Sequence, residues 1–258
     1  GLRYKIVKRL LSPYGKYKEF LDQSQWWSKE ELEAFQLQKL KKVVELAYKY
    51  TPYYRTTMEI FDVTPDDIKS LKDISRIPIL EKEDVRRNSD KMISDKAIKA
   101  LLYEAHTSGS TGKPLRLYRN LDNIGFEHAM LMRQWQWAGL EHNDRYACIK
   151  GDIMSSCKIR NNEFWAFSPL DNRLYMSSYH IKDENLKYYL AALQKYKVVG
   201  IEGYPSSLFA LAKYMLAKKE TFPVRAVLTT SETLLPFQKE VIMQAFQCNV
   251  YDYYGMAE

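Results

Sequence analysis

The chain has 258 residues, 46% of them hydrophobic and 28% charged, which is typical of a globular protein and excludes a disordered or fibrous one. No apolar run reaches the about 18 residues that a membrane-spanning helix needs. Lys5, Lys8 and Arg9 interrupt the start of the chain, where a signal peptide would be apolar. We therefore expect a protein without a transmembrane segment, located in the cytoplasm.

The net charge is +7, with Lys and Arg spread through the chain and no nucleic-acid-binding motif among them. This distribution excludes a dedicated nucleic-acid-binding protein and favours a solvated basic surface, with a weak contact to an acidic membrane surface as the alternative. The cysteines Cys148, Cys157 and Cys248 lack C-x-x-C spacing, so we expect free thiols in a reducing compartment.

The first third of the chain is predicted to be helical. Apolar residues recur at helical spacing from Lys29 to Tyr50, Ser28 and Glu31 form a plausible capping box, and Thr51-Pro52 ends the helix. Residues 77–86 are predicted to form a turn that leads into another helix. We expect a helical N-terminal region over residues 1–95 and an α/β region over residues 96–258.

The run from His106 to Pro114 combines hydroxyl side chains, glycines and a lysine between two short segments that are predicted to be strands. Glycine lets the backbone approach an anion closely, while hydroxyls, N–H groups and lysine supply donors and positive charge. A phosphate-binding loop is therefore predicted, with an ordinary polar hairpin turn as the alternative. The loop differs from that of the common nucleotide hydrolases, because only two residues separate Gly109 from Gly112 and Pro114 follows Lys113.

Aromatic residues in the next segment, Phe126, Trp135 and Trp137, follow helical spacing and are predicted to belong to the core, with Phe126 a weak candidate for a substrate pocket.

The last third alternates between strand and helix patterns. Strands are predicted at 173–179, 198–201, 224–229 and 249–253, and helices at 183–195, 205–218 and 236–246. This alternation predicts right-handed crossovers and a mainly parallel sheet with flanking helices.

Ligands of such sheets bind beyond the carboxyl ends of the strands. Three of these ends carry polar, glycine-bearing or acidic residues, at 203–206, 230–233 and 253–258. We therefore expect a binding site at that edge.

These segments resemble motifs of the adenylate-forming (acyl-CoA synthetase-like) superfamily. The run from Thr107 to Pro114 is similar to its signature phosphate loop, and the segment from Tyr251 to Glu258 is similar to its Tyr-Gly-x-Thr-Glu motif. Residues 37–40, 51–55 and 77–84 resemble the phenylacetate–CoA ligase branch, including its CapK-like members. The resemblance spans roughly Leu37 to Glu258, and it implies the fold of the N-terminal domain of adenylate-forming enzymes.

The resemblance implies a reaction in which a carboxylic acid is activated by ATP and Mg²⁺ to an acyl-adenylate with release of pyrophosphate. An acceptor such as CoA then takes the acyl group. The same resemblance assigns Lys113 and Glu258 as catalytic residues, with Glu258 also a metal ligand. It assigns the β- and γ-phosphates to Thr107, Ser108, Gly109, Ser110, Thr111, Gly112 and Lys113.

Adenine and ribose are assigned by the resemblance to Ser231, Glu232, Thr233, Tyr253, Tyr254 and Gly255. Tyr204, Pro205 and Phe126 are weak candidates for the acyl pocket. Each assignment has a structural alternative: a tyrosine such as Tyr254 can simply pack, Glu258 can be solvated, and Tyr204-Pro205 can serve only to start a helix.

Two features depart from the family pattern. Ala257 stands where the family usually has a hydroxyl residue, and the family's C-terminal lid domain with its lysine has no counterpart before Glu258. We expect a fragment of a longer enzyme. The alternatives are a non-catalytic nucleotide-binding remnant and an interaction protein. The carboxylate is not identified by the sequence, and a homodimer is compatible with it.

Overall fold

The computed structural model describes residues 13–106, 115–151, 162–170 and 172–255. The chain divides into two compact units, Gly1–Leu131 and Met132–Glu258. The helix α6 (Leu121–Trp137) begins in the first unit and ends in the second. In the described parts of the chain, no helix is long and apolar enough to cross a membrane.

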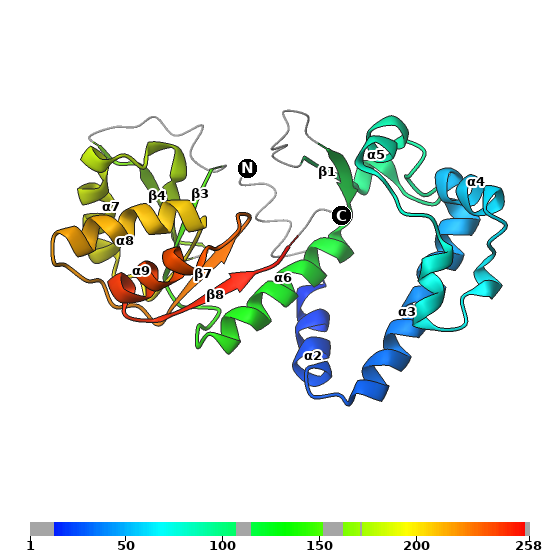
Figure 1. The fold of residues 1–258 in the computed structure, drawn as a ribbon, viewed down its shortest axis with the longest axis horizontal. Coiled ribbons are helices and arrows are strands. Elements are labelled where there is room, and N and C mark those ends of the chain that lie inside the picture. The colour runs from blue at the N-terminus through cyan, green and yellow to red at the C-terminus, as the bar shows by residue number, and fades with distance from the viewer. Residues whose placement is uncertain (1–12, 107–114, 152–161, 171, 256–258) are drawn as a thin grey trace. The chain divides into compact units, whose positions relative to one another are not determined.

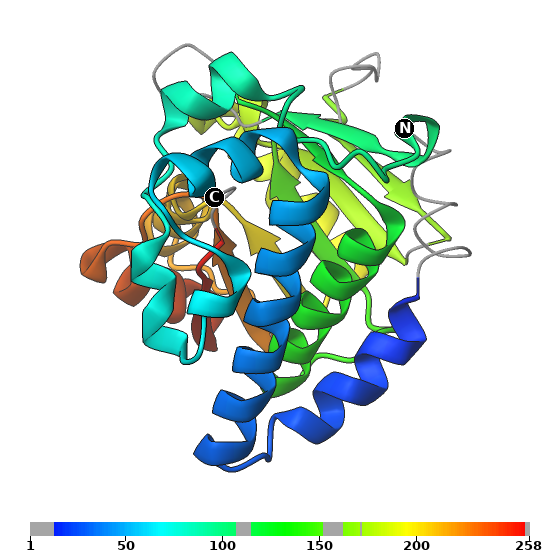
Figure 2. The ribbon, with the colours of Figure 1, turned by 90° about the vertical axis from the view of Figure 1, so that its right-hand side faces the viewer.

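The first unit is mainly helical, as predicted (Figure 1). Its elements before α6 are α2 (Tyr14–Ser24), α3 (Lys29–Tyr50), α4 (Pro52–Ile60), η1 (Pro65–Asp67), η2 (Leu71–Arg76), α5 (Lys82–Asn88), η3 (Lys99–Leu101), β1 (Tyr103–His106) and β2 (Arg116–Arg119). Figure 2 shows α3 with α4 and the η1–η2 segment packed alongside it. Val44, Met58, Val63 and Ile68 form the small core between these elements.

The bounds of α3 follow from its end groups. The Ser28 Oγ accepts a hydrogen bond from the Glu31 N–H (3.2 Å), and the Glu31 Oε2 accepts one from the Ser28 N–H (2.7 Å). Thr51 is extended (φ −122°), and Pro52 starts α4 at a position whose N–H needs no partner. The predicted capping box and the proline stop are both confirmed.

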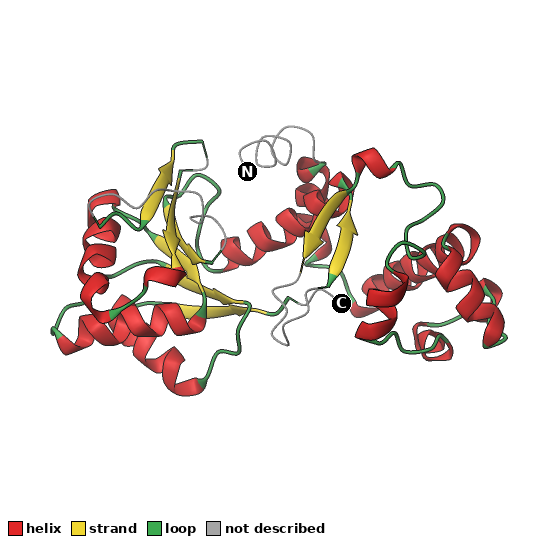
Figure 3. Cartoon of the chain, turned by 90° about the horizontal axis from the view of Figure 1, so that it is seen from above, coloured by secondary structure: helices red, strands yellow, loops and turns green. Residues whose placement is uncertain are grey.

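The second unit contains a sheet of six strands in the order β4-β5-β3-β6-β7-β8. The sheet consists of β3 (Tyr146–Lys150), β4 (Trp165–Ser168), β5 (Arg173–Ser177), β6 (Gly200–Gly203), β7 (Ala226–Thr230) and β8 (Asn249–Tyr253). Only β4 runs antiparallel to its neighbour among these strands, so the sheet is mainly parallel, as predicted (Figure 3).

The helices α7 (Asp183–Tyr196), α8 (Pro205–Ala217) and α9 (Pro236–Phe246) are the crossovers, and η4 (Ser178–His180) follows β5. The apolar residues of α7, α8 and α9 pack on one face of the sheet, on side chains such as Ile149, Ile201 and Val227. Along the central strands these side chains alternate with residues that point to the opposite face. On that opposite face, the last turns of α6 bring the Trp135 ring to 4.1 Å from the Tyr146 ring.

Several predicted boundaries need correction. The strand at 173–179 ends at Ser177, and the strand predicted at 198–201 runs from Gly200 to Gly203. The sequence analysis missed β3 and β4. Trp137 is 58% exposed and does not belong to the core, whereas Trp135 is 1% exposed. Residues two apart lie on different sides of a helix, so a single apolar stripe cannot include both side chains.

Candidate functional site

The parallel strands bring polar residues together at one edge of the sheet, where β5, β3, β6, β7 and β8 all end. The strand-end residues are Ser177, Lys150, Gly203, Thr230 and Tyr253. This is the edge at which a site was expected, and we call it the carboxyl edge.

The loop after β7 is tied to the start of α8 by Glu232. Its Oε2 accepts a hydrogen bond from the Ser206 N–H (3.0 Å), and its Oε1 accepts one from the Ser206 Oγ (3.1 Å). The carboxylate therefore caps a helix N-terminus that has no side-chain cap of its own. Ser231 is in the left-handed region at φ 68°, which turns the chain sharply after the strand.

Side-chain hydrogen bonds also join the ends of β7 and β8. The Thr229 Oγ1 donates to Asp252 Oδ1 at 2.6 Å, and the Gln134 amide of α6 donates to the Asp252 carbonyl oxygen at 3.1 Å. Tyr254 follows β8 and is 86% exposed, so its ring is not packed in the described structure. Gly255 is required here, because a Cβ would lie 2.7 Å from a carbon of the Tyr253 ring.

A buried ion pair that the sequence analysis did not find lies at the ends of β3 and β6. Lys150 Nζ and Glu202 Oε1 are 2.5 Å apart, with the two side chains 27% and 6% exposed. Burial opposes the charge on Lys150, but the charge and hydrogen bond of Glu202, together with Cys148 and Tyr204, outweigh burial and raise the pKa of the ammonium above its ordinary value. The signal in the sequence was a glutamate between the apolar and small residues of a buried strand, followed by the candidate Tyr204.

Tyr204 lies beside this ion pair. Its phenol oxygen accepts a long hydrogen bond from the Gly151 N–H (3.4 Å), directly after β3. A Cβ on Gly151 would lie 3.0 Å from the Tyr179 phenol oxygen, so the missing side chain makes room for a second phenol. Pro205 is buried at the first position of α8, which is the helix-start role given above as its alternative.

The remaining predicted site residues belong to the first unit or lie outside the described residues. Phe126 lies on the part of α6 in the first unit, where its ring contacts the Tyr17 ring edge-on at 5.2 Å. Residues 107–114 and Glu258 lie outside the described residues. The flanking strands β1 and β2 pair antiparallel, with His106 opposite Arg116, so the predicted phosphate loop connects the two strands of a hairpin.

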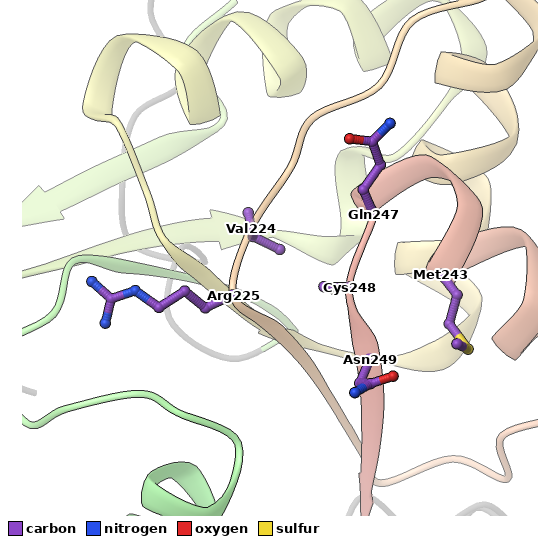
Figure 4. A pocket seen from close by; sticks show the side chains of 6 residues that line it. All are labelled: Val224, Arg225, Met243, Gln247, Cys248 and Asn249. Atoms are coloured by element: carbon purple, nitrogen blue, oxygen red, sulfur yellow. The ribbon is translucent and has the colours of Figure 1, made fainter.

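Two shallow hollows among the described residues of the second unit lie at the opposite edge, which we call the amino edge. One has a volume of about 480 Å³ and is lined by Val224, Arg225, Met243, Gln247, Cys248 and Asn249, next to the starts of β7 and β8. Figure 4 shows that the labelled side chains diverge instead of converging on one point. The second, about 510 Å³, is formed by residues 136 and 139–143. Neither hollow includes a residue of the carboxyl edge.

Comparison with known proteins identifies relatives of the chain, although no family model matches it. It is 30% identical to protein CapK of Staphylococcus aureus over 191 residues, which are 73% of this chain and 42% of CapK. It is 41% identical to the phenylacetate–coenzyme A ligase of Aromatoleum evansii over 98 residues, 38% of this chain and 22% of that enzyme. The chain therefore aligns with less than half of the length of these curated relatives.

The fold is found in solved structures of a CoA ligase. The open conformation of 2-hydroxyisobutyryl-CoA ligase, in complex with 2-HIB-AMP and CoA, matches 89% of this chain and 54% of its own, with a TM-score of 0.65 and 20% identity. The postadenylation state of the same enzyme with 2-HIB-AMP matches with the same score over 49% of its chain. The chain is thus a relative of CapK and the phenylacetate–coenzyme A ligases, and it has the fold of the adenylate-forming CoA ligases.

Proposed function

We propose that the protein to which this chain belongs activates a carboxylic acid as an acyl-adenylate at the expense of ATP and then transfers the acyl group to CoA. The observation that carries the proposal is that the loops after β6, β7 and β8 start from one sheet edge, where Glu232 of the loop after β7 bonds to Ser206 at the start of α8 and Thr229 bonds to Asp252 between the ends of β7 and β8. These are loops that the sequence resemblance assigns to the acyl group and the nucleotide.

In the first step a carboxylate oxygen of the acid attacks the α-phosphorus of ATP. A bond to the α-phosphorus forms, the bond to the bridging oxygen of the β-phosphate breaks, and pyrophosphate leaves. In the second step the CoA thiol attacks the acyl carbon, a thioester forms, and AMP and a proton are released. Fixed donors and cations placed around the moving phosphate charge supply much of the rate in such reactions. We assign that role to Lys113 and the hydroxyl and N–H groups of residues 107–112.

The described residues fit a nucleotide better than they fit a metal ion. The exposed Tyr254 ring and the Ser231 hydroxyl offer a stacking surface and a hydrogen-bonding group beside the ends of β7 and β8. Two carboxylates at this edge, Glu232 and Asp252, already bond to Ser206 and Thr229. No cluster of three or more metal-binding side chains occurs among the described residues.

We therefore keep Glu258 as the proposed ligand of Mg²⁺. When bound, the ion would neutralise phosphate charge through oxygen ligands, which it prefers.

The test is pyrophosphate release by the complete gene product with a panel of carboxylic acids. Lys113→Ala should lower kcat about 100-fold, because removing one donor that stabilises transition-state charge costs about 3 kcal/mol. Lys213→Ala, on the exposed side of α8, is the matched control and should leave the rate unchanged. Thermal melts of both variants check that the fold survives.

An unchanged rate in Lys113→Ala would remove the role assigned to the loop. If the unmodified protein released no pyrophosphate with any acid but bound ATP in a titration, the chain would be part of a nucleotide-binding protein that is not a ligase.

A further inference from the structure

At the ends of β5, β3 and β6 lie four polar side chains and a glycine that the assigned nucleotide loops do not use. We call this group the polar corner and define it as Lys150, Gly151, Tyr179, Glu202 and Tyr204. The Lys150–Glu202 ion pair lies on the two central strands, and the phenol oxygens of Tyr179 and Tyr204 both approach Gly151. All five residues belong to the second unit.

The ion pair is not explained by stability. Taking the Glu202 carboxylate out of water costs several kcal/mol by order of magnitude, and apolar residues of similar volume often do as well as or better than such a pair in a protein interior. A pair with a glutamate side chain only 6% exposed therefore calls for another role. Its position at the carboxyl edge, where parallel sheets bind their ligands, indicates what that role is.

The chemistry of the pair selects a neutral polar group. The Lys150 ammonium offers only donors, and the Glu202 carboxylate offers only acceptors. A hydroxyl or an amide both donates and accepts, so it can bind both partners at once. A second carboxylate would be opposed by Glu202, and an amine by Lys150. The phenol groups of Tyr179 and Tyr204 also both donate and accept.

The polar corner adjoins the loop proposed for the nucleotide. Tyr204 ends β6 and begins α8, and two residues later Ser206 is bonded to Glu232 in the loop after β7. The register places β6 directly between β3 and β7. An acyl-adenylate whose nucleotide lies over β7 and β8 can therefore extend its acyl group along the same edge to β6 and β3.

We infer that the polar corner selects the acyl substrate, and that this substrate is a carboxylic acid bearing a hydroxyl or an amide and not an unsubstituted arylacetate. Lys150 and Glu202 are the specificity-determining residues. This inference rests on the proposed function and adds the class of acid to it.

The experiment compares acids that differ by one hydroxyl in the complete gene product, with pyrophosphate release as the readout. Mandelate and 4-hydroxyphenylacetate are paired with phenylacetate, and 3-hydroxybutyrate is paired with butyrate. At least one hydroxylated acid should have the higher kcat/KM, by roughly tenfold or more, which is the range expected for a hydrogen bond to a charged group.

The variant is the double substitution Lys150→Met with Glu202→Leu, which removes both charges and leaves neither ion buried alone. It should abolish the preference for the hydroxylated acid and keep activity with the apolar partner. The same two changes at Lys29 and Glu33, an exposed pair on α3 with Nζ and Oε1 3.8 Å apart, are the matched control and should leave the preference intact.

Two results would overturn the inference while the proposed function stands. One is pyrophosphate release with every acid and no preference for the hydroxylated partners. The other is a preference that survives the double substitution. Release with no acid at all would contradict the proposed function itself and, with it, the inference.

Discussion

The two edges of the sheet both contain charged side chains, but the partners of these charges differ. At the amino edge the guanidinium of Arg145 donates to the Tyr196 carbonyl oxygen (3.0 Å), and Arg225 pairs with Asp144 at 2.5 Å. At the carboxyl edge the contacts join the ends of neighbouring strands or the loops that follow them, as in Lys150–Glu202 and Thr229–Asp252.

The amino-edge contacts are structural, whereas the carboxyl-edge contacts lie where we propose the site. Both arginines of the amino edge also bond to main-chain carbonyls, Arg145 to that of Tyr196 and Arg225 to that of Gly139 (3.5 Å), so their contacts hold the loops before the strands. The two hollows described above lie at this edge, so hollow volume and strand direction point to different edges. Strand direction is the better guide, because it determines where polar loops gather around a ligand.

The largest expected effect is on the carboxyl edge. Lys150→Ala should lower the free energy of unfolding by about 3 kcal/mol, because it leaves the Glu202 carboxylate buried without its partner. The double variant Lys150→Met with Glu202→Leu should recover most of this loss. Urea unfolding followed by circular dichroism measures both. Equal stability of the single and the double variant would show that the pair is not buried in the way described.

A smaller effect is expected at the amino edge. Asp144 accepts hydrogen bonds from Arg225 (2.5 Å) and from the Glu141 N–H (2.8 Å). Asp144→Ala should lower the free energy of unfolding by about 1–2 kcal/mol. It should leave the kcat for pyrophosphate release unchanged well below the melting temperature, and Asp144→Asn should retain part of the stability. A loss of kcat would break the division between the edges.

The cap formed by Glu232 gives the next effect. Glu232→Ala should cost about 1 kcal/mol of stability, as for the loss of a helix N-cap. It should also raise the KM for ATP more than it lowers kcat, because the loop after β7 loses its attachment to Ser206. Glu232→Gln retains an acceptor oxygen and should recover much of both. An unchanged KM in the alanine variant would place the loop away from the nucleotide.

The last effect appears only in alkaline solution and is a pH dependence at the amino edge. Burial raises the pKa of the Cys248 thiol from 9.0 to about 11. Above pH 9 the unfolded chain loses this proton before the folded chain does, so stability should fall between about pH 9 and 11. Cys248→Ala should make the unfolding free energy less dependent on pH between about pH 9 and 11. Near pH 7, the pH dependence of the unfolding free energy should be the same for the two proteins. Parallel curves for the two proteins would show that the thiol is not shielded from water.

Local patterns in the sequence were sufficient for most of the architecture. The bounds of α3 and α9 and the end of β8 were predicted correctly, because caps, prolines and apolar periodicity act within a few residues. The order of strand and helix then gave the parallel sheet and the edge at which its loops gather. The phosphate loop and Glu258 were identified by resemblance to the family motifs. Their roles in binding phosphate and Mg²⁺ stay predictions.

Long-range contacts decided the rest. β3 is buried almost throughout and β4 has only four residues, so neither shows the alternation that marks a strand with one face in water. Which charges meet also depends on sheet register: Lys150 and Glu202 are 52 positions apart, and only the pairing of β3 with β6 brings them together. The sequence by itself indicated the family, most of the elements and the edge at which the loops gather. The tertiary structure decided which polar groups share that edge, because pairing between distant strands has no local signal in the chain.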